Sequence, residues 1–154
     1  MSAPEPDVPS TITVTSPAFA DGQRIPADHT CRGAGRLPEL AWRDVPAAAA
    51  SLALVVSDPD APKGTFIHWL LYDLPPGDGG VAPGRLPAGA KEGENSAGRT
   101  GWFPPCPPSG THRYVFTLYA LREPASGRST REILDDIERV AVARGTLTGL
   151  VPAG

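Results

Sequence analysis

The chain has few aromatic residues and no excess of basic residues, and each of these two shortages argues against a class of protein. Aromatic residues make up 6% of the 154 residues, so a base-stacking platform is not expected. Lysine and arginine number 14 against 17 acidic residues, for a formal net charge of −3. Nucleic-acid binding needs a basic surface. We therefore expect no nucleic-acid partner.

Long hydrophobic runs are also missing. No apolar stretch approaches the ~18 residues that a membrane-spanning helix needs, so no transmembrane segment is expected. Residues 1–10 have neither a basic start nor an apolar core and do not resemble a secretory signal. The sequence therefore predicts a cytoplasmic location.

Cysteine and histidine are too sparse to form a familiar metal site. Cys31 and Cys106 lie far apart, without the spacing of a zinc ribbon or a redox pair. The three histidines have no His-x-x-x-His spacing, so we expect no metal and no cofactor. A disulfide between the two cysteines is possible but is disfavoured in a reducing compartment.

Proline and glycine, in contrast, are abundant, at 19 and 17 residues. Because both residues disfavour helix interiors, the composition predicts a β-rich domain with many loops. We expect a flexible lead-in over residues 1–10 and a single domain over residues 11–154. Runs of apolar and β-branched residues predict strands at 11–15, 51–57, 66–73, 112–122 and 146–150. The three middle runs are apolar on both faces, which is typical of central strands covered on both sides.

One amphipathic helix is predicted near the C-terminus. Ser129 and Glu132 have the spacing of a capping box, and Gly145 is expected to end the helix. The apolar positions between them share one helical face and are Ile133, Leu134, Ile137, Val140 and Ala141.

Strand alternation places an ionisable residue near one end of each long strand. On the strand predicted at 51–57, Leu54 and Val56 share a face with Asp58, which follows it. One face of the strand at 66–73 carries Phe66, His68, Leu70 and Tyr72. One face of the strand at 112–122 carries His112, Tyr114, Phe116 and Leu118. If these ends are neighbours, Asp58 orients an imidazole, and His68, His112 and the Tyr114 hydroxyl offer donors to a small anion.

Structural roles compete with this interpretation. A histidine on an apolar strand face is commonly a hydrogen-bonded core residue, and side chains in the turn that begins at Asp58 commonly cap backbone N–H groups. Cys106 is either a nucleophile or a small packed side chain. Its segment is rigid and poor in N–H donors because it contains Pro104, Pro105, Pro107 and Pro108.

Two motifs resemble the signatures of the phosphatidylethanolamine-binding protein family. The first is Asp58-Pro-Asp-Ala-Pro62 followed by His68-Trp69, and the second is Cys106-Pro-Pro-Ser-Gly-Thr-His-Arg-Tyr114. Cys31-Arg-Gly33 with Leu40-Ala-Trp42 is similar to the lead-in of the bacterial and archaeal branch, often described as Raf-kinase-inhibitor-like. The resemblance extends over nearly the whole chain from about Thr11.

The resemblance implies a mainly β fold in which a large central antiparallel sheet packs with a smaller sheet, with one C-terminal amphipathic helix. It also implies a homodimer and a pocket for a small anion or a phospholipid head group. The positions that match the family's pocket are Asp58, Asp60, His68, Pro107, Pro108, His112 and Tyr114. Where the family usually has glycines, this chain has Phe103, Pro104 and Pro105, from which we expect a pocket that is narrower, more apolar or redirected to another ligand.

Three functions are compatible with these residues. The first is binding of a small anionic or phospho-containing ligand, which we favour because the motifs contain no complete catalytic signature. The second is an acid–base enzyme, a cyclase or isomerase of a small metabolite. Its catalytic residues would be Asp58, His68, His112 and Tyr114. The third is a kinase-inhibitor-like regulator of another protein, for which the sequence has no motif.

Overall fold

The computed structural model describes residues 8–154, so most of the predicted lead-in (residues 1–10) lies outside the described residues. The last two residues of this lead-in run beside the C-terminal part of the chain. Ser10 forms a β-bridge with Arg144, and the Pro9 carbonyl accepts a hydrogen bond from the Arg144 N–H.

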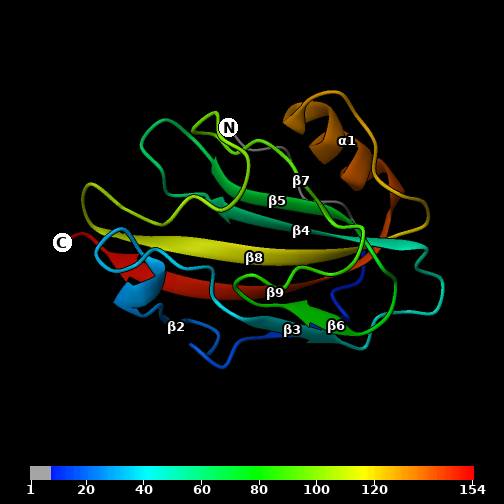
Figure 1. Ribbon diagram of the computed structural model, residues 1–154, viewed down its shortest axis with the longest axis horizontal. Helices are drawn as coiled ribbons and strands as arrows, with labels where there is room; N and C mark the ends of the chain where they lie inside the picture. The colour runs from blue at the N-terminus through cyan, green and yellow to red at the C-terminus, as the bar shows by residue number, and fades with distance from the viewer. Residues whose placement is uncertain (1–7) are drawn as a thin grey trace.

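Two sheets form the body of the structure (Figure 1). The larger has the order β2 (Gln23–Arg24), β9 (Ala141–Pro152), β8 (Thr111–Leu121), β4 (Ser51–Asp58), β5 (Phe66–Leu74) and β7 (Lys91–Glu92). All its pairings are antiparallel except that of β2 with β9. The smaller sheet has the order β1 (Thr13–Thr15), β3 (Leu40–Arg43) and β6 (Gly79–Val81).

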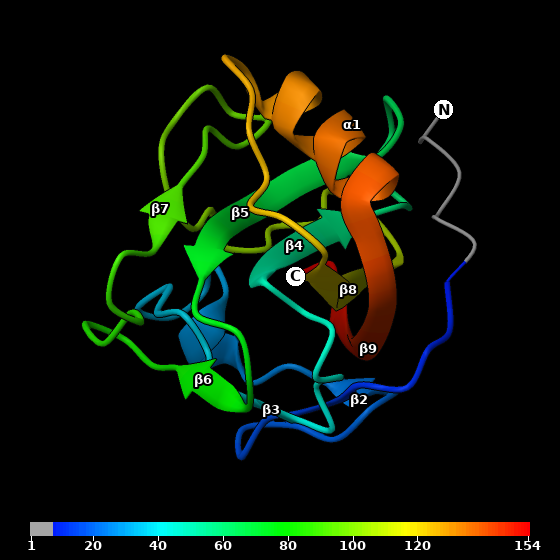
Figure 2. The ribbon, with the colours of Figure 1, turned by 90° about the vertical axis from the view of Figure 1, so that its right-hand side faces the viewer.

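The large sheet is covered on both faces, as Figure 2 shows. One face packs against the small sheet through a core that includes Trp42, Leu54 and Phe116. The other face packs under α1 (Thr130–Val140), where Val55 and Ile137 belong to a second core. This arrangement confirms the predicted two-sheet fold with one C-terminal helix. No helix within residues 8–154 has the length and hydrophobicity to cross a bilayer.

The long central strands were predictable because each carries its own run of buried apolar residues. The short strands β2, β3, β6 and β7 were not predicted, since strands of two to four residues depend on their neighbours for pairing. The last strand is longer than the predicted 146–150, because β9 pairs with β8 from Ala141 to Pro152.

The helix begins as predicted and ends earlier than predicted. The Ser129 hydroxyl accepts the Glu132 N–H at 3.2 Å, as a capping residue does. The helix ends at Val140, because the chain from Ala141 onward pairs with β8. Gly145 therefore lies inside β9, where a Cβ atom would collide with the Ile12 main chain. Its role is close main-chain contact and not helix termination.

The β4–β5 pair contains a β-bulge that decides where His68 points. Val56 lies opposite Trp69 and Ser57 lies opposite Ile67, so His68 is the extra residue. The ring of His68 reaches Tyr114 on β8, whereas Leu70 and Tyr72 pack in the core under α1. The prediction that Phe66, His68, Leu70 and Tyr72 share one face is therefore wrong beyond His68, because the bulge shifts the alternation.

Candidate functional site

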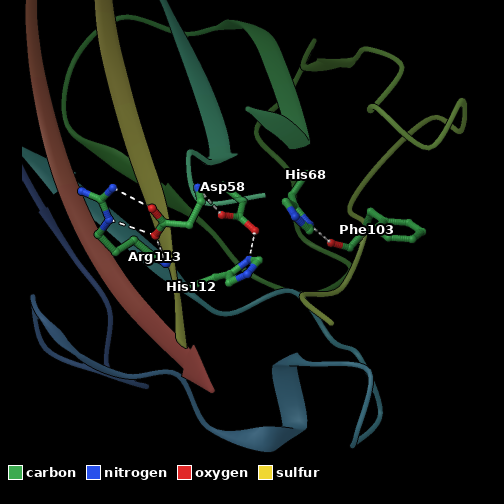
Figure 3. Close-up of polar contacts among 6 residues, drawn as sticks. Asp58, His68, Phe103, His112 and Arg113 are labelled. Carbon is green, nitrogen blue, oxygen red and sulfur yellow. Dashed lines mark hydrogen bonds and ion pairs between the residues drawn. The ribbon is translucent and has the colours of Figure 1, made fainter. Parts of the chain in front are cut away.

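The centre of the site is a buried aspartate–histidine pair on adjacent strands. Asp58 ends β4 and His112 lies at the start of β8, and the antiparallel pairing brings these two ends together. His112 donates from Nδ1 to Asp58 Oδ2 at 2.6 Å, and the two residues are 7% and 3% exposed (Figure 3). Asp58 Oδ1 accepts the Asp60 N–H at 2.8 Å. Asp58 thus both caps its turn and orients an imidazole.

The second histidine is held by the main chain of Phe103. His68 donates from Nδ1 to the Phe103 carbonyl at 2.7 Å, and the Phe103 N–H donates to the His68 carbonyl at 2.9 Å. Burial lowers the pKa of His68, against the opposing effects of the Phe103 carbonyl and the Asp58 charge. At neutral pH His68 is therefore an uncharged imidazole with its proton on Nδ1.

Aromatic rings surround His68. Its ring centroid lies 5.1 Å from that of Tyr114, 4.8 Å from that of Phe66 and 5.9 Å from that of Phe103. Tyr114 also stacks on His112, with centroids 6.4 Å apart. Burial, followed by the negative charge of Asp58, raises the pKa of the Tyr114 hydroxyl, so the phenol stays protonated at neutral pH.

Asp60 takes part in a separate interaction. Its carboxylate accepts the Arg113 N–H at 2.9 Å and bonds the guanidinium through Nε at 3.0 Å and Nη2 at 2.8 Å. These bonds lower the pKa of Asp60 to about 2. In Figure 3 Arg113 lies on the side away from His68 and Phe103. The structure therefore places Asp60 with Arg113 and brings Asp58, His68, His112 and Tyr114 together.

The proline-rich segment is cross-linked to the loop after the 3₁₀ helix η1 (Ala27–His29). Cys106 and Cys31 form a disulfide with a Cα–Cα distance of 5.4 Å, and the Cys31 N–H donates to the Pro105 carbonyl at 3.0 Å. The expectation against this disulfide is wrong, and so are both roles predicted for Cys106. Folding brings the two loops together in a way that sequence separation does not reveal. In the same segment Pro107 is buried and Pro108 is exposed.

Two features of the site were missed by sequence reasoning. The Phe103 carbonyl is a main-chain atom, and main-chain acceptors leave no mark in the residue type. Arg113 lies next to His112 on β8, so alternation correctly turns it away from the histidines, but its pairing with Asp60 depends on the shape of the turn. An acidic residue in the turn beside a basic residue on the adjoining strand is the only signal for that pair.

The fold and the site together define the class: this is a two-sheet β protein with an aspartate–histidine pair beside a second histidine. The chain belongs to the phosphatidylethanolamine-binding protein family, whose model matches residues 15–151. It is 42% identical over 147 residues to a UPF0098 protein of Methanothermobacter thermautotrophicus, covering 89% of this chain and 96% of that protein. It is also 52% identical over 112 residues to the Mycobacterium tuberculosis protein named "Putative lipoprotein LppC". That match covers 71% of this chain and 55% of the relative, so the chain spans about half of the relative's length.

Two crystal structures from bacteria resemble the fold closely. A phosphatidylethanolamine-binding protein homologue from Chlamydia trachomatis, CT736, superposes with a TM-score of 0.85 at 37% identity, covering 94% of this chain and 99% of the other. Escherichia coli YbcL has the same TM-score of 0.85 at 27% identity, covering 94% and 100% of the two chains. The family and its fold are therefore established for this chain.

Proposed function

We propose that this protein binds a small anionic or phospho-containing ligand at the edges of the His68 and His112 rings. Membership of the family supports an anion-binding pocket in this region. The observation that carries the proposal is the 2.6 Å pair of Asp58 and His112 beside a second histidine. Because Asp58 takes Nδ1 of His112, Nε2 is the ring nitrogen left for a ligand.

The burial of the site supports a small ligand. Asp58, His68 and His112 are 3%, 4% and 7% exposed, so a ligand reaches ring edges and not whole side chains. The Phe103 ring lies beside His68, and the prolines that follow it stiffen this segment. We include Pro107 and Pro108 in the site, as the resemblance to the family implies. A phosphate group or a phospholipid head group fits such a site better than an extended chain.

The test is titration calorimetry with inorganic phosphate and with acetate. We expect the single substitutions His68→Ala and His112→Ala to abolish measurable binding of both anions. His29→Ala is the matched control, because His29 is the last residue of η1 and bonds the Arg36 carbonyl instead of the site. Unchanged binding in both site variants would refute the proposal.

A second candidate, acid–base catalysis, is favoured by one observation. The carboxylate–imidazole pair is the arrangement that general bases use, and the protonated Tyr114 hydroxyl could act as an acid. Such an enzyme would isomerise or cyclise a small metabolite. A pH–rate profile on a candidate substrate tests this, and a profile without an inflection in the histidine range would contradict it.

We further propose that the protein folds in an oxidising compartment. The Cys31–Cys106 disulfide favours this location over the cytoplasm predicted from residues 1–10. The name of the mycobacterial relative, a lipoprotein, points the same way. Alkylation of freshly isolated native protein, followed by mass spectrometry, should leave both cysteines unmodified. Modification of both would support the cytoplasmic prediction instead.

The homodimer implied by the resemblance stays a proposal as well. Sedimentation of the wild-type protein should give twice the 16.1 kDa mass of the chain. A monomer mass at all accessible concentrations would contradict it.

A further inference from the structure

The segment that holds His68, residues 102–108, is short of hydrogen-bond donors. It contains four prolines, which have no N–H to donate. Within residues 8–154, its hydrogen bonds to other parts of the chain are the two between Phe103 and His68 and the one from the Cys31 N–H to the Pro105 carbonyl. The position of this segment therefore depends largely on contacts of other kinds.

The Cys31–Cys106 disulfide is the covalent contact that fixes this segment. It joins the segment to the loop after η1. The two prolines between Cys106 and Phe103 have a fixed φ, so a restraint on Cys106 is carried to Phe103. The carbonyl of Phe103 in turn accepts a hydrogen bond from His68 Nδ1 at 2.7 Å (Figure 3). A series of stiff connections thus runs from the disulfide to the ring of His68.

Both cysteine residues of this disulfide are exposed, so a small thiol can approach it from solution. Exposed disulfides are the ones that thiol–disulfide exchange reduces most readily. We propose that the Cys31–Cys106 disulfide is a redox switch for the position of His68, which a dithiol opens. In the oxidised protein the Phe103 carbonyl orients His68. In the reduced protein the segment 102–108 moves, and His68 loses this partner.

The dithiol supplies the electrons for this reduction. One of its thiolates attacks a sulfur of the disulfide, forms a mixed disulfide and releases the other cysteine as a thiolate. The second thiol of the reductant then attacks the mixed disulfide and releases the remaining cysteine. Two electrons and two protons pass to the protein, and the dithiol leaves as a disulfide. An oxidised disulfide of the same class reverses the transfer.

The switch acts on one histidine of the site and leaves the other in place. His112 is held by Asp58 at 2.6 Å, and the two residues lie on neighbouring strands of the large sheet. Neither residue belongs to the segment 102–108 or to the loop after η1. Reduction therefore releases His68 alone. Its effect on binding rests on the proposed function, because an anion that contacts both rings then loses one of its contacts.

Imidazole ¹⁵N NMR of the wild-type protein, before and after reduction by dithiothreitol, tests the switch without a ligand. In the oxidised protein the Nδ1 and Nε2 signals of His68 should be well separated, because the Phe103 carbonyl keeps the ring proton on Nδ1. After reduction the two signals should approach each other, as the released ring samples both tautomers. The signals of His112 should keep their positions, because its partner Asp58 does not move.

Titration with inorganic phosphate measures the effect of the switch on binding. We expect the affinity to fall at least about tenfold on reduction, as the loss of one hydrogen bond to a charged group predicts, and to return on oxidation with oxidised glutathione. Cys31→Ser/Cys106→Ser should have the reduced-state affinity with and without dithiothreitol. Ile137→Ala is the control for lost stability, because it leaves a cavity in the core under α1. It should keep the oxidised-state affinity and the His68 signals.

Each outcome has a distinct meaning. The switch is overturned if the disulfide of the folded protein resists dithiothreitol, if the His68 signals stay unchanged on reduction, or if phosphate affinity does not change when they move. Loss of the whole fold on reduction, seen by circular dichroism, also overturns it, since a switch releases one segment and leaves the sheets intact. Oxidised protein that binds no phosphate refutes the proposed function, while the His68 signals still test the switch.

Discussion

Replacing Asp58 by asparagine changes one atom of the central pair and should lower stability moderately. Asparagine keeps the oxygen that caps the Asp60 N–H at 2.8 Å. It turns an NH₂ group toward His112 Nδ1, where the native carboxylate accepts at 2.6 Å. A hydrogen bond to a charged group contributes about 1.5–3 kcal/mol and a neutral one about 1 kcal/mol. We therefore expect the free energy of unfolding of Asp58→Asn to fall by about 1–2 kcal/mol at pH 7.

The same substitution should reverse the tautomer of His112. Because the new NH₂ group donates, Nδ1 must accept and the ring proton moves to Nε2. A neutral His112 then offers an Nε2–H donor to the ligand, and the affinity for O-phosphoethanolamine should differ from that of the wild type.

Two assays measure these effects. Urea unfolding, followed by tryptophan fluorescence, gives the change in stability, and Asp58→Ala should cost more, about 3–5 kcal/mol, because it leaves buried His112 without a partner. Calorimetry with O-phosphoethanolamine gives the change in affinity. Wild-type stability in both variants, or wild-type affinity in a folded Asp58→Asn protein, would refute the reasoning.

Three further predictions concern the surroundings of the site. The double substitution Cys31→Ser/Cys106→Ser should lower the free energy of unfolding by about 4 kcal/mol, because the disulfide joins residues 75 positions apart. Urea unfolding with and without reductant measures this loss, and a wild-type stability that does not change with reductant would contradict the prediction. Asp60→Asn should cost about 1 kcal/mol at pH 7, allowing for the 29% exposure of the carboxylate. The folded pKa of Asp60, about 2, lies below the ordinary 3.8, so its contribution to stability is complete above pH 3.8 and is lost as pH falls through 2. A stability deficit of Asp60→Asn that stays constant in urea titrations from pH 7 to pH 2 would count against this prediction. Phe103→Gly keeps the carbonyl that bonds His68 and removes the ring beside it, so it should raise affinity for O-phosphoethanolamine relative to inorganic phosphate; an unchanged ratio in calorimetry would show that the ring does not limit the site.

The long strands and the start of the helix could be predicted because their signals are local. The run from Ser51 to Asp58 is buried along most of its length, and Ser129 caps the helix through a neighbour three residues away. The end of the helix could not be predicted, because pairing of Ala141 with Leu121 on β8 decides it. That pairing depends on residues that are distant in sequence.

The four side chains of the site were predictable from the ends of apolar strands, but their hydrogen bonds were not. Alternation places His112 and Tyr114 on one face of β8, and the structure agrees. The same rule places His68 on the face that it takes in the structure. The bulge at His68 then turns Leu70 to the opposite face, so the prediction for Leu70 is wrong. The carbonyl of Phe103 depends on the path of a long loop, which residue types do not encode locally.

Imidazole ¹⁵N NMR of the wild-type protein, with and without inorganic phosphate, tests most directly that the two histidines contact the ligand. Our account predicts that the Nε2 signals of His68 and His112 shift on addition of phosphate and that the His29 signals stay unchanged. Phosphate that leaves both site histidines unmoved, or that shifts only His29, would contradict it.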